Sequence, residues 1–298
     1  MLSILIPVYN YDVNGLVNEL HRQVSNESID FEIICLDDKS DTSFIEANKS
    51  IESLSDTRLT LATTNKGIAG TRQDLVNLAK YDWVLLVDAD TKPKSKDYIK
   101  DYLDYVNTGH EAIFGGFAYN EEPPEAEKLL RWKYGRKYEA ISAADRNSKP
   151  FKVTIAANLL IKKHIYKNLH LDQPGNYYGM DLLFGPKLQA NITKVLHIDN
   201  QVFHLGLESS ESYLKKTEKA VETLWNLHSS NQLEQHQNTL LSTFLKVKKY
   251  GLRKLLSTTF KVLKNSITRN LTGKNPSTTL FQFYKLMYLC QLSKVYKD

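Results

Sequence analysis

Cysteines and long apolar runs are both scarce in this sequence. Its 298 residues include two cysteines, Cys35 and Cys290, each within an apolar run. Two thiols cannot build a disulfide framework or a four-thiolate metal site, and they indicate a reducing compartment. No apolar stretch approaches the roughly 20 residues that span a bilayer, and the first residues lack the basic segment of a signal peptide. We therefore expect a cytoplasmic protein that does not thread a membrane.

Acidic residues are almost absent from the last part of the chain. Residues 240–298 contain 12 Lys or Arg and one acid, Asp298. Because the whole chain has a net charge of +5, the remainder is net acidic. This asymmetry predicts two functions in one polypeptide: chemistry in the acidic body, and attachment of the basic tail to an anionic partner.

What the chain does have is an ordinary globular composition, with 42% hydrophobic and 24% charged residues. Strand and helix signals alternate, which predicts an α/β fold with a mainly parallel sheet flanked by helices. Ligands bind beyond the carboxyl ends of the strands in such sheets. The expected strands are 3–8, 31–36, 59–63, 83–87, 112–117, 153–161, 194–198 and 201–204, and the expected helices are 12–24, 42–54, 70–80, 95–106 and 126–138, with loops at 142–149 and 177–185 and helical chain from 210.

A glycine-rich turn is missing after the first expected strand. The strand runs into Pro7-Val8-Tyr9-Asn10, and the first glycine is Gly15. Dinucleotide-binding enzymes need glycines at this turn so that backbone can approach a pyrophosphate, and P-loop proteins need a loop ending in Gly-Lys-Ser/Thr. Both absences disfavour nicotinamide enzymes and P-loop nucleotide hydrolases.

Carboxylates stand at a strand end instead. Asp88 and Asp90 directly follow the apolar run 83–87. In an extended segment residues two apart point to the same side, where two carboxylates converge on one hard cation. An isolated pair of this kind is usually a solvated turn, but its place after a buried strand favours a ligand site. The sequence therefore predicts a Mn²⁺ or Mg²⁺ site for a nucleotide diphosphate.

Four segments carry a family resemblance when they are taken in order. They are 3–10 (SILIPVYN), 36–41 (LDDKSD), 65–72 (NKGIAGTR) and 87–90 (VDAD). Together they resemble the nucleotide-sugar-binding half of family-2 glycosyltransferases with the GT-A fold, a Rossmann-like mixed sheet flanked by helices. The resemblance covers residues 1–210, the expected catalytic domain, and leaves 211–298 as a helical, basic C-terminal extension.

The resemblance implies a nucleobase pocket on the donor side. Pro7 and Tyr9 would border this pocket, and one of Asp37 and Asp38 would accept a hydrogen bond from the uracil N3–H. Arg72 would contact the base or the phosphates. The alternatives are structural: an acidic turn that precedes a helix, and a solvated arginine in the first turn of a helix.

The remaining donor residues implied by the resemblance surround the sugar and the diphosphate. Asn65 and Gly67 belong to the third matched segment and are expected to bind the donor. Asp88 would face the ribose and sugar next to the metal, and Asp90 would bind the metal. His204 lies in a segment that supplies a metal-binding histidine in many relatives, although a lone histidine at a strand end can equally be structural.

The acceptor side is implied by two further segments. Asp181 stands where the family has its catalytic base, preceded by Gly179 and Met180, which would line the acceptor site. Met180 replaces the usual Glu, so any acceptor contact made by that Glu is missing. Asn158 would touch sugar hydroxyls. For Asp181 the alternative is an aspartate that only caps a helix.

The reaction implied is transfer of a hexosyl or N-acetylhexosaminyl group from a nucleotide-diphosphate sugar, commonly a UDP-sugar, to a hydroxyl of a glycan or lipid-linked acceptor. One base and no evident second nucleophile predict a single displacement with inversion, dependent on Mn²⁺ or Mg²⁺. Two alternatives stay open. The Met180 departure allows a non-catalytic member that binds glycans or assembles with other transferases, and a nucleotidyltransferase also uses acidic pairs and metal.

The basic tail contains an amphipathic pattern. Apolar residues recur at spacings of three and four, with lysines and arginines off that line: Leu252, Leu256, Phe260, Leu263 and Ile267. Such a helix lies in an anionic membrane interface, which would put the protein at the inner face of the plasma membrane, or packs on the body with its lysines outward. Residues 281–289 form a second such helix or a dimer contact, so the oligomeric state stays open. No nucleic-acid motif is present, and no nucleic acid partner is expected.

Overall fold

The computed structural model describes residues 1–171, 178–233 and 237–295. The chain forms two compact units. The first, here called the sheet unit, comprises residues 1–118, 140–176 and 187–206, and the second, the helical unit, comprises 119–139, 177–186 and 207–298. In the part of the chain so described, no helix is both long and apolar enough to cross a lipid bilayer.

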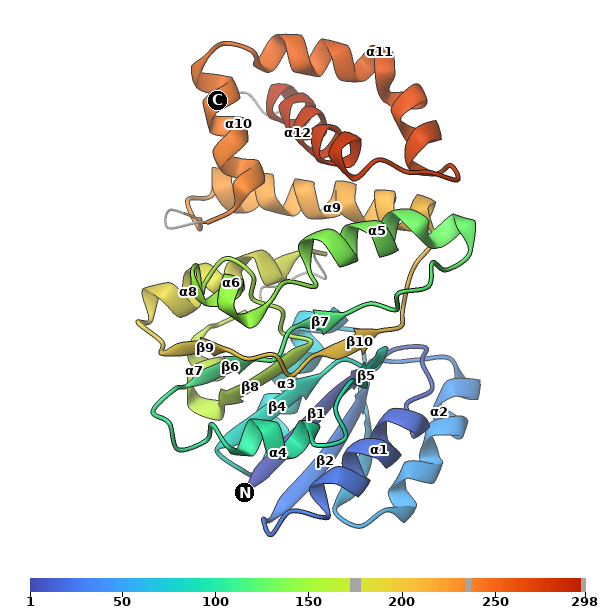
Figure 1. Ribbon diagram of the computed structural model, residues 1–298, viewed down its shortest axis with the longest axis vertical. Coiled ribbons are helices and arrows are strands. Elements are labelled where there is room, and N and C mark those ends of the chain that lie inside the picture. The colour runs from blue at the N-terminus through green and yellow to red at the C-terminus, as the bar shows by residue number, and fades with distance from the viewer. Residues whose placement is uncertain (172–177, 234–236, 296–298) are drawn as a thin grey trace. The chain divides into compact units, whose positions relative to one another are not determined.

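A seven-stranded mixed sheet organises the sheet unit (Figure 1), with the order β3-β2-β1-β4-β8-β6-β9. β1 pairs in parallel with β2 and β4, and β8 runs antiparallel to β4 and β6. The carboxyl ends of β1, β2 and β4 therefore share one edge. The strands are β1 (Leu2–Val8), β2 (Phe31–Asp37), β3 (Thr57–Leu61), β4 (Trp83–Val87), β6 (Ala112–Phe114), β8 (Asn158–Lys162) and β9 (Val195–His197).

Helices cover both faces of this sheet. Every residue of β1 and β4 is buried, which explains why both strands are continuous apolar runs rather than alternating ones. The chain steps outward from β1 to β3 and then returns to β4, so right-handed crossovers put α1 and α2 on one face and α3 on the other. The helices and short 3-10 turns of this unit are α1 (Asn14–Val24), α2 (Thr42–Asn48), η1 (Lys49–Ser53), α3 (Gly67–Leu78), α4 (Tyr98–Leu103), α6 (Ala143–Asn147) and α7 (Lys163–Asn168).

A second, three-stranded sheet brings distant parts of the chain together. β10 (Val202–His204) lies between β5 (Thr91–Pro93) and β7 (Phe117–Ala118). β5 begins immediately after Asp90, and the register pairs Thr91 with His204. This pairing places His204, which comes late in the sequence, close to the end of β4.

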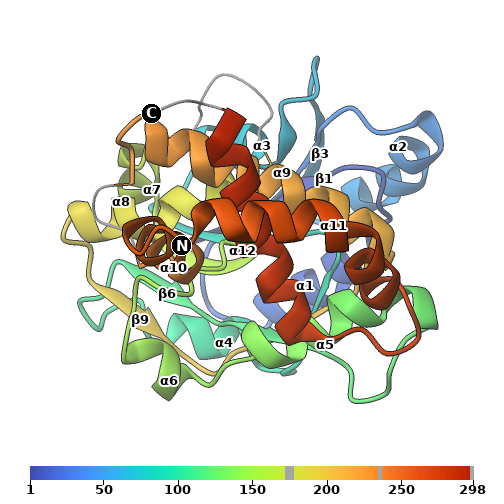
Figure 2. The ribbon, with the colours of Figure 1, turned by 90° about the horizontal axis from the view of Figure 1, so that it is seen from above.

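The helical unit is built around α12, which is enclosed by α9, α10 and α11 (Figures 1 and 2). Its elements are η2 (Ala126–Lys128), α5 (Leu129–Tyr138), η3 (Met180–Leu183), α9 (Ser210–Ser229), α10 (Thr239–Lys249), α11 (Arg253–Leu271) and α12 (Thr278–Val295), and α8 (Phe184–Ala190) runs from this unit into the other. The core cluster consists of Leu130, Tyr213, Leu214, Phe260, Ile267, Leu271, Phe281, Tyr284 and Met287.

The amphipathic face predicted in the tail packs into this core. Phe260 and Ile267 are buried, and Leu256 packs against the same cluster. Of the five predicted residues, Leu252 and Leu263 stay exposed. The predicted apolar line therefore mainly holds α11 on its own chain, which is the packing alternative, because α12 supplies the apolar surface that it needs.

The predicted mixed sheet flanked by helices, followed by a helical C-terminal region, is confirmed. Some local expectations differ. The strand expected over 153–161 begins at Asn158, and the expected polar loop at 142–149 contains α6. Of the expected loop at 177–185, Tyr177 lies outside the described residues. The division into two units also differs from the expected single boundary at 210. Residues 119–139 and 177–186 belong to the helical unit, because α5 and η3 contact α9.

Candidate active site in the sheet unit

The candidate donor site lies at the carboxyl ends of the parallel strands. Pro7 is buried within β1, and Tyr9, just beyond it, is exposed. Beyond β2, Asp38 donates its backbone N–H to the Val8 carbonyl, which ties the ends of the two strands together. The expected nucleobase residues are thus neighbours at one edge of the sheet.

Asp38 holds the start of α3. Its two carboxylate oxygens accept the backbone N–H groups of Lys66 and Gly67, both at 2.8 Å, and its carbonyl accepts from the Asn65 amide at 2.9 Å. Gly67 has a φ of 70°, a conformation that costs glycine little. The carboxylate satisfies backbone donors that a helix start leaves open, so Asp38, Asn65 and Gly67 together shape this loop.

Asp37 differs from Asp38 in its hydrogen bonding. One oxygen, Oδ1, accepts the Ser40 backbone N–H at 2.7 Å. The other, Oδ2, is buried and has no hydrogen-bond partner within the described residues. A buried oxygen without a partner is costly and usually marks a site that a ligand or water completes. Of the two neighbouring acids, Asp37 is therefore the one with an acceptor left for a ligand.

Arg72 and Asp88 form an ion pair at the end of β4. Arg72 projects from α3 and is 3% exposed, and its Nη2 lies 2.7 and 2.9 Å from the two oxygens of Asp88. The backbone of Asp88 is also held, because its N–H donates to the Ala157 carbonyl at 3.1 Å. A buried arginine keeps its charge, so this ion pair fixes both side chains and occupies the Asp88 carboxylate that the sequence also assigned to a metal.

Asp90 and His204 meet through the β5–β10 pairing. Asp90 Oδ2 and His204 Nε2 are 3.2 Å apart, and Leu205 N–H donates to the Asp90 carbonyl at 2.8 Å. A Cβ at Gly206 would lie 2.0 Å from Asp90 Oδ2, so a residue with a side chain there would displace this carboxylate. Stacking of the His204 ring on Phe117, with centroids 5.2 Å apart, further orients the imidazole.

The donor set of Asp90 and His204 suits a divalent ion. Both side chains are partly exposed, and a carboxylate oxygen with an imidazole nitrogen is a combination that Mn²⁺ accepts. No group of three or more His, Cys, Asp or Glu suited to a metal occurs among the described residues. Ions of this kind commonly take few protein ligands and complete their shell with substrate phosphates and water, so two ligands fit an ion that arrives with a diphosphate.

Tyr11 is a neighbour of this pair that the sequence did not single out. Partial burial raises the pKa of its hydroxyl, and the negative charge of Asp90 acts in the same direction. The tyrosine therefore stays protonated as a hydrogen-bond donor close to Asp90. Nothing in the local sequence marks it, because its role comes from the turn that follows β1.

Asn158 does not have the surroundings expected of an acceptor residue. It is fully buried, and its Oδ1 accepts from the hydroxyls of Tyr98 and Tyr102 at 2.7 and 2.6 Å. Its Nδ2 donates to the carbonyls of Gly116 and Asn200. All its hydrogen-bonding positions are used inside the core, so we correct the prediction: Asn158 is a structural residue that joins β8, α4 and the chain before β10.

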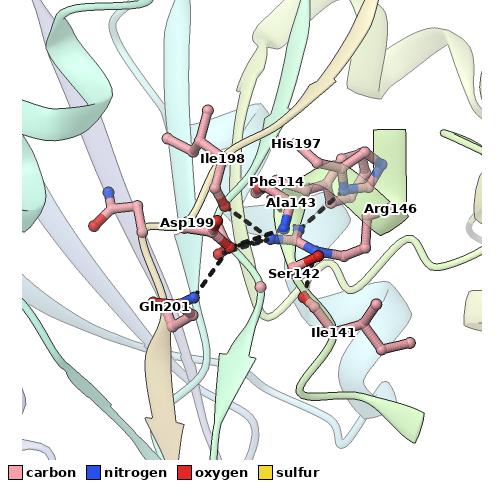
Figure 3. A network of polar contacts seen from close by, with 12 residues as sticks. Phe114, Ile141, Ser142, Ala143, Arg146, His197, Ile198, Asp199 and Gln201 are labelled. Carbon is pink, nitrogen blue, oxygen red and sulfur yellow. Dashed lines mark hydrogen bonds and ion pairs between the residues drawn. The ribbon is translucent and has the colours of Figure 1, made fainter. Parts of the chain in front are cut away.

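A second buried network holds the chain that leads into β10 (Figure 3). Arg146 is 2% exposed, and its guanidinium donates to the carbonyls of Ile141, Phe114, Gly115 and Ile198 and to Nδ1 of His197. Asp199 lies 3.8 Å away. Gly116 must be glycine here, since a Cβ would lie 2.7 Å from the guanidinium. No sequence pattern indicates this network, because an arginine in a polar segment normally predicts exposure.

Apart from Asn158, the residues expected on the acceptor side belong to the helical unit. Gly179 has a φ of 93°, and a Cβ on it would lie 3.1 Å from the Cα of Ala220, so glycine permits close packing on α9. Met180 is buried, which makes it a packing residue rather than one whose side chain meets an acceptor. Asp181 is exposed in the first turn of η3.

Asp181 has an aromatic neighbour, Tyr178, within the same unit. Partial burial raises the pKa of the Tyr178 hydroxyl to about 12, and Glu208 and Asp181 add to the effect. Glu208 is paired with Lys216, whose Nζ lies 5.7 Å from the centre of the Tyr178 ring. The sequence analysis missed Tyr178, Glu208 and Lys216. Tyr178 lies near both Asp181 and Glu208, and Lys216 pairs with Glu208.

A mixed sheet with carboxylates at the ends of its parallel strands is the architecture of a nucleotide-sugar-binding GT-A domain. Comparison with known proteins agrees. Residues 3–169, more than half of the chain, match the family described as Glycosyl transferase family 2. The chain belongs to this family, as the four sequence segments predicted.

Similar solved structures support the fold. Mannosyltransferase PcManGT from Pyrobaculum calidifontis, solved with GDP-Man and Mn²⁺, has a TM-score of 0.58 at 10% identity, and the match covers 99% of this chain and 87% of that one. S. aureus TarS 1-349 in complex with UDP has a TM-score of 0.51 at 15% identity, covering 99% and 91%. At these identities the likeness concerns the fold, and it extends over the helical unit as well.

One relative is closer in sequence. The Poly(ribitol-phosphate) beta-glucosyltransferase of Bacillus spizizenii is 32% identical over 126 residues. The alignment covers 41% of this chain and 17% of that protein, so the chain spans less than a fifth of that relative.

Proposed function

We propose that this chain transfers a hexosyl or N-acetylhexosaminyl group from a nucleotide-diphosphate sugar to a hydroxyl group, with inversion at the anomeric carbon. The observation that carries the proposal is the pair formed by Asp90 and His204. Asp90 lies two residues after Asp88, which forms the ion pair with Arg72. Membership of Glycosyl transferase family 2 supports it. A carboxylate–imidazole pair that holds a divalent ion would suit a diphosphate group.

On the donor side, the proposed nucleotide is uridine diphosphate. The unpartnered Oδ2 of Asp37 accepts the N3–H of uracil, and Pro7 and Tyr9 border the base. Arg72 orients the diphosphate, and Asp88, held by Arg72, faces the ribose and sugar. The UDP complex of a protein with a similar fold, TarS, is consistent with this choice.

Asp90 and His204 would hold the Mn²⁺ or Mg²⁺ ion. When bound, such an ion supplies positive charge that neutralises the departing diphosphate, an effect worth several kcal/mol. The Mn²⁺ in the complex of the mannosyltransferase PcManGT supports the choice of ion.

Asp181 acts as the general base. The acceptor oxygen forms a bond to the anomeric carbon, the bond from that carbon to the diphosphate oxygen breaks, and the acceptor proton passes to the Asp181 carboxylate. A positioned base of this kind contributes about 10²–10⁴ in rate. With one displacement the configuration of the anomeric carbon inverts.

The proposed acceptor is a glycan or a lipid-linked polymer that carries free hydroxyl groups. The name of the Bacillus spizizenii relative specifies poly(ribitol-phosphate), which makes a polyol-phosphate polymer the first acceptor to assay. Such a polymer offers many hydroxyl groups, and these are the only groups that the base has to activate.

Titration calorimetry tests the donor site without knowledge of the acceptor. UDP should bind in the presence of Mn²⁺ and bind at least about tenfold more weakly when the ion is chelated. Hydrolysis of UDP-sugars in a donor screen then identifies the sugar. Tight, metal-independent binding of glycans without donor binding would instead indicate a non-catalytic member, and release of pyrophosphate from a nucleoside triphosphate would indicate a nucleotidyltransferase.

A further inference from the structure

The surface of α10 and α11 carries an unusual concentration of exposed apolar side chains. Of the 15 large hydrophobic side chains that are exposed among the described residues, six lie between positions 245 and 263. Scattered exposed apolar residues are normal, but a concentration of them marks an interaction site. The set called here the α10–α11 surface consists of Leu245, Tyr250, Leu252, Leu255, Val262 and Leu263.

The exposed face of α11 is distinct from the face that packs inward. Leu255 and Val262 are 61% and 75% exposed. Their spacing of seven residues puts them on one side of the helix, one turn along from Leu252. Phe260 and Ile267 point to the core from another side. The helix therefore has apolar side chains on two faces, and the described residues cover only one of them.

The turn between the helices adds an exposed aromatic side chain to this set. Gly251 has a φ of 72° and ends α10, with its N–H donating to the Lys248 carbonyl and the Leu252 N–H donating to the Val247 carbonyl. This glycine cap lets the chain reverse within a few residues. Tyr250, just before it, is 72% exposed, and a tyrosine of this kind suits the boundary between water and lipid.

Positive charge surrounds these apolar side chains. Residues 235–297 contain no Asp or Glu. Exposed lysines flank the surface on both helices, at Lys246, Lys248, Lys249, Lys254 and Lys261. A lysine can keep its ammonium group in water while its stem lies along apolar surface. The absence of acids means that nothing in this segment offsets the attraction to a negatively charged partner.

We propose that the α10–α11 surface docks on an anionic lipid surface. The combination of exposed leucine, valine and tyrosine with lysines is that of an interfacial helix, in which apolar side chains enter the acyl boundary and lysines contact headgroups. A phosphate polymer would use the lysines and leave the leucines in water. A second copy of the chain would bring two lysine-rich surfaces together, which charge repulsion opposes. The inference is independent of the chemistry proposed for the sheet unit.

Vesicle sedimentation with the full chain tests this surface. Wild-type protein should pellet with vesicles of phosphatidylglycerol and phosphatidylcholine in equal parts and stay in solution with phosphatidylcholine alone. Each of two variants should bind the anionic vesicles more than about tenfold more weakly. The apolar variant is Leu252→Ser/Leu255→Ser/Val262→Ser, and the lysine variant is Lys248→Gln/Lys249→Gln/Lys254→Gln.

Matched controls come from exposed positions in the sheet unit. Ile192→Ser removes an apolar side chain that is 86% exposed, and Lys80→Gln/Lys96→Gln/Lys149→Gln removes the same charge as the lysine variant; both should pellet as wild type. Equal thermal unfolding of all the proteins shows that the substitutions leave the fold intact.

Three outcomes would overturn the proposal. Wild-type protein that stays in solution with anionic vesicles excludes a lipid surface. Loss of binding in the lysine variant with full binding by the apolar variant indicates recognition of phosphate groups alone, as in a polymer. A dimer in light scattering that the apolar variant abolishes, together with no vesicle binding, indicates a second copy of the chain as the partner.

Discussion

The strand ends of the sheet unit and the buried ion pair of the helical unit treat their charged residues in opposite ways. At the strand ends of the sheet unit, Asp90 is partly exposed and Asp37 keeps a buried oxygen without a partner among the described residues. In the helical unit, Arg131 donates to both oxygens of Glu139, at 3.2 and 3.0 Å, and its guanidinium lies 5.1 Å from the centre of the Tyr213 ring. The first arrangement is incomplete, and the second is closed.

This difference teaches how to separate ligand sites from structural ion pairs. A buried charge that only stabilises the fold must find its partners within the chain, because desolvation is costly. A charge that binds a ligand is left with unfilled positions, which the ligand completes. Substitutions should therefore affect catalysis and binding at the strand ends and stability in the closed networks, and the following predictions test that separation from the largest effect to the smallest.

Asp181→Asn should lower the transfer rate by about 10²–10⁴, since the amide cannot take the acceptor proton. Affinity for UDP should stay within about twofold of wild type, because the donor residues belong to the other unit. Transfer assays and calorimetry measure the two quantities. Glu211→Gln is the control, as Glu211 is also an exposed acid in the first turn of a helix; turnover by Asp181→Asn at the rate of this control would remove Asp181 from the mechanism.

Asp90→Asn should reduce the metal-dependent affinity for UDP by about a hundredfold, because an amide oxygen carries no charge for a divalent ion. Calorimetry with and without Mn²⁺ should show that the variant binds UDP as weakly as wild type does without the ion. Asp97→Asn, which changes an exposed acid a few residues further along, should bind as wild type. Full metal dependence in Asp90→Asn would contradict the assignment of the site.

Arg146→Met should lower the free energy of unfolding by about 3 kcal/mol, since it leaves several buried carbonyls without a donor. Urea unfolding measures this change. Arg22→Met is the control: Arg22 pairs with Glu19 on the surface, and its loss should change the free energy by less than about 1 kcal/mol. Similar values for the two variants would mean that the network in Figure 3 contributes little to stability.

The two units should also respond to different ranges of pH. Burial, with a smaller contribution from the charge of Arg146, lowers the pKa of His197 from 6.5 to about 4. The unfolded chain therefore binds the extra proton between these values, and stability falls as the pH drops from 6.5 to 4. Burial lowers the pKa of Lys285 from 10.5 to about 8, so stability falls as the pH drops from 10.5 to 8.

Two variants separate these ranges. His197→Gln should flatten the pH dependence of unfolding on the acid side alone, and Lys285→Met should flatten it on the alkaline side alone. Urea unfolding across the pH range measures both. If either variant flattens the dependence in the other unit's range, the assignment of that range is wrong.

The position of the donor-side acids at the strand ends could be predicted from sequence, and the surroundings of Asn158 could not. Asp37 ends β2, Asp38 follows it, and Asp88 and Asp90 follow β4. The edge at which parallel strands end is a direct consequence of the α/β pattern. The sequence around Asn158 looks like the start of a strand whether the residue binds an acceptor or lies in the core, and its role was therefore misjudged. Only the two tyrosines and two carbonyls that surround it reveal a core residue.

The sequence by itself determined the family, the mixed sheet with its helical continuation, and the acids at the strand ends, because these depend on short segments whose pattern and order are local. Only the tertiary structure decided which of two adjacent acids holds α3, that His204 meets Asp90, and which side of α11 remains exposed. These three features depend on strand register and on burial between segments that are far apart in the chain. Neither the register nor the burial is encoded in the spacing of residues along one segment.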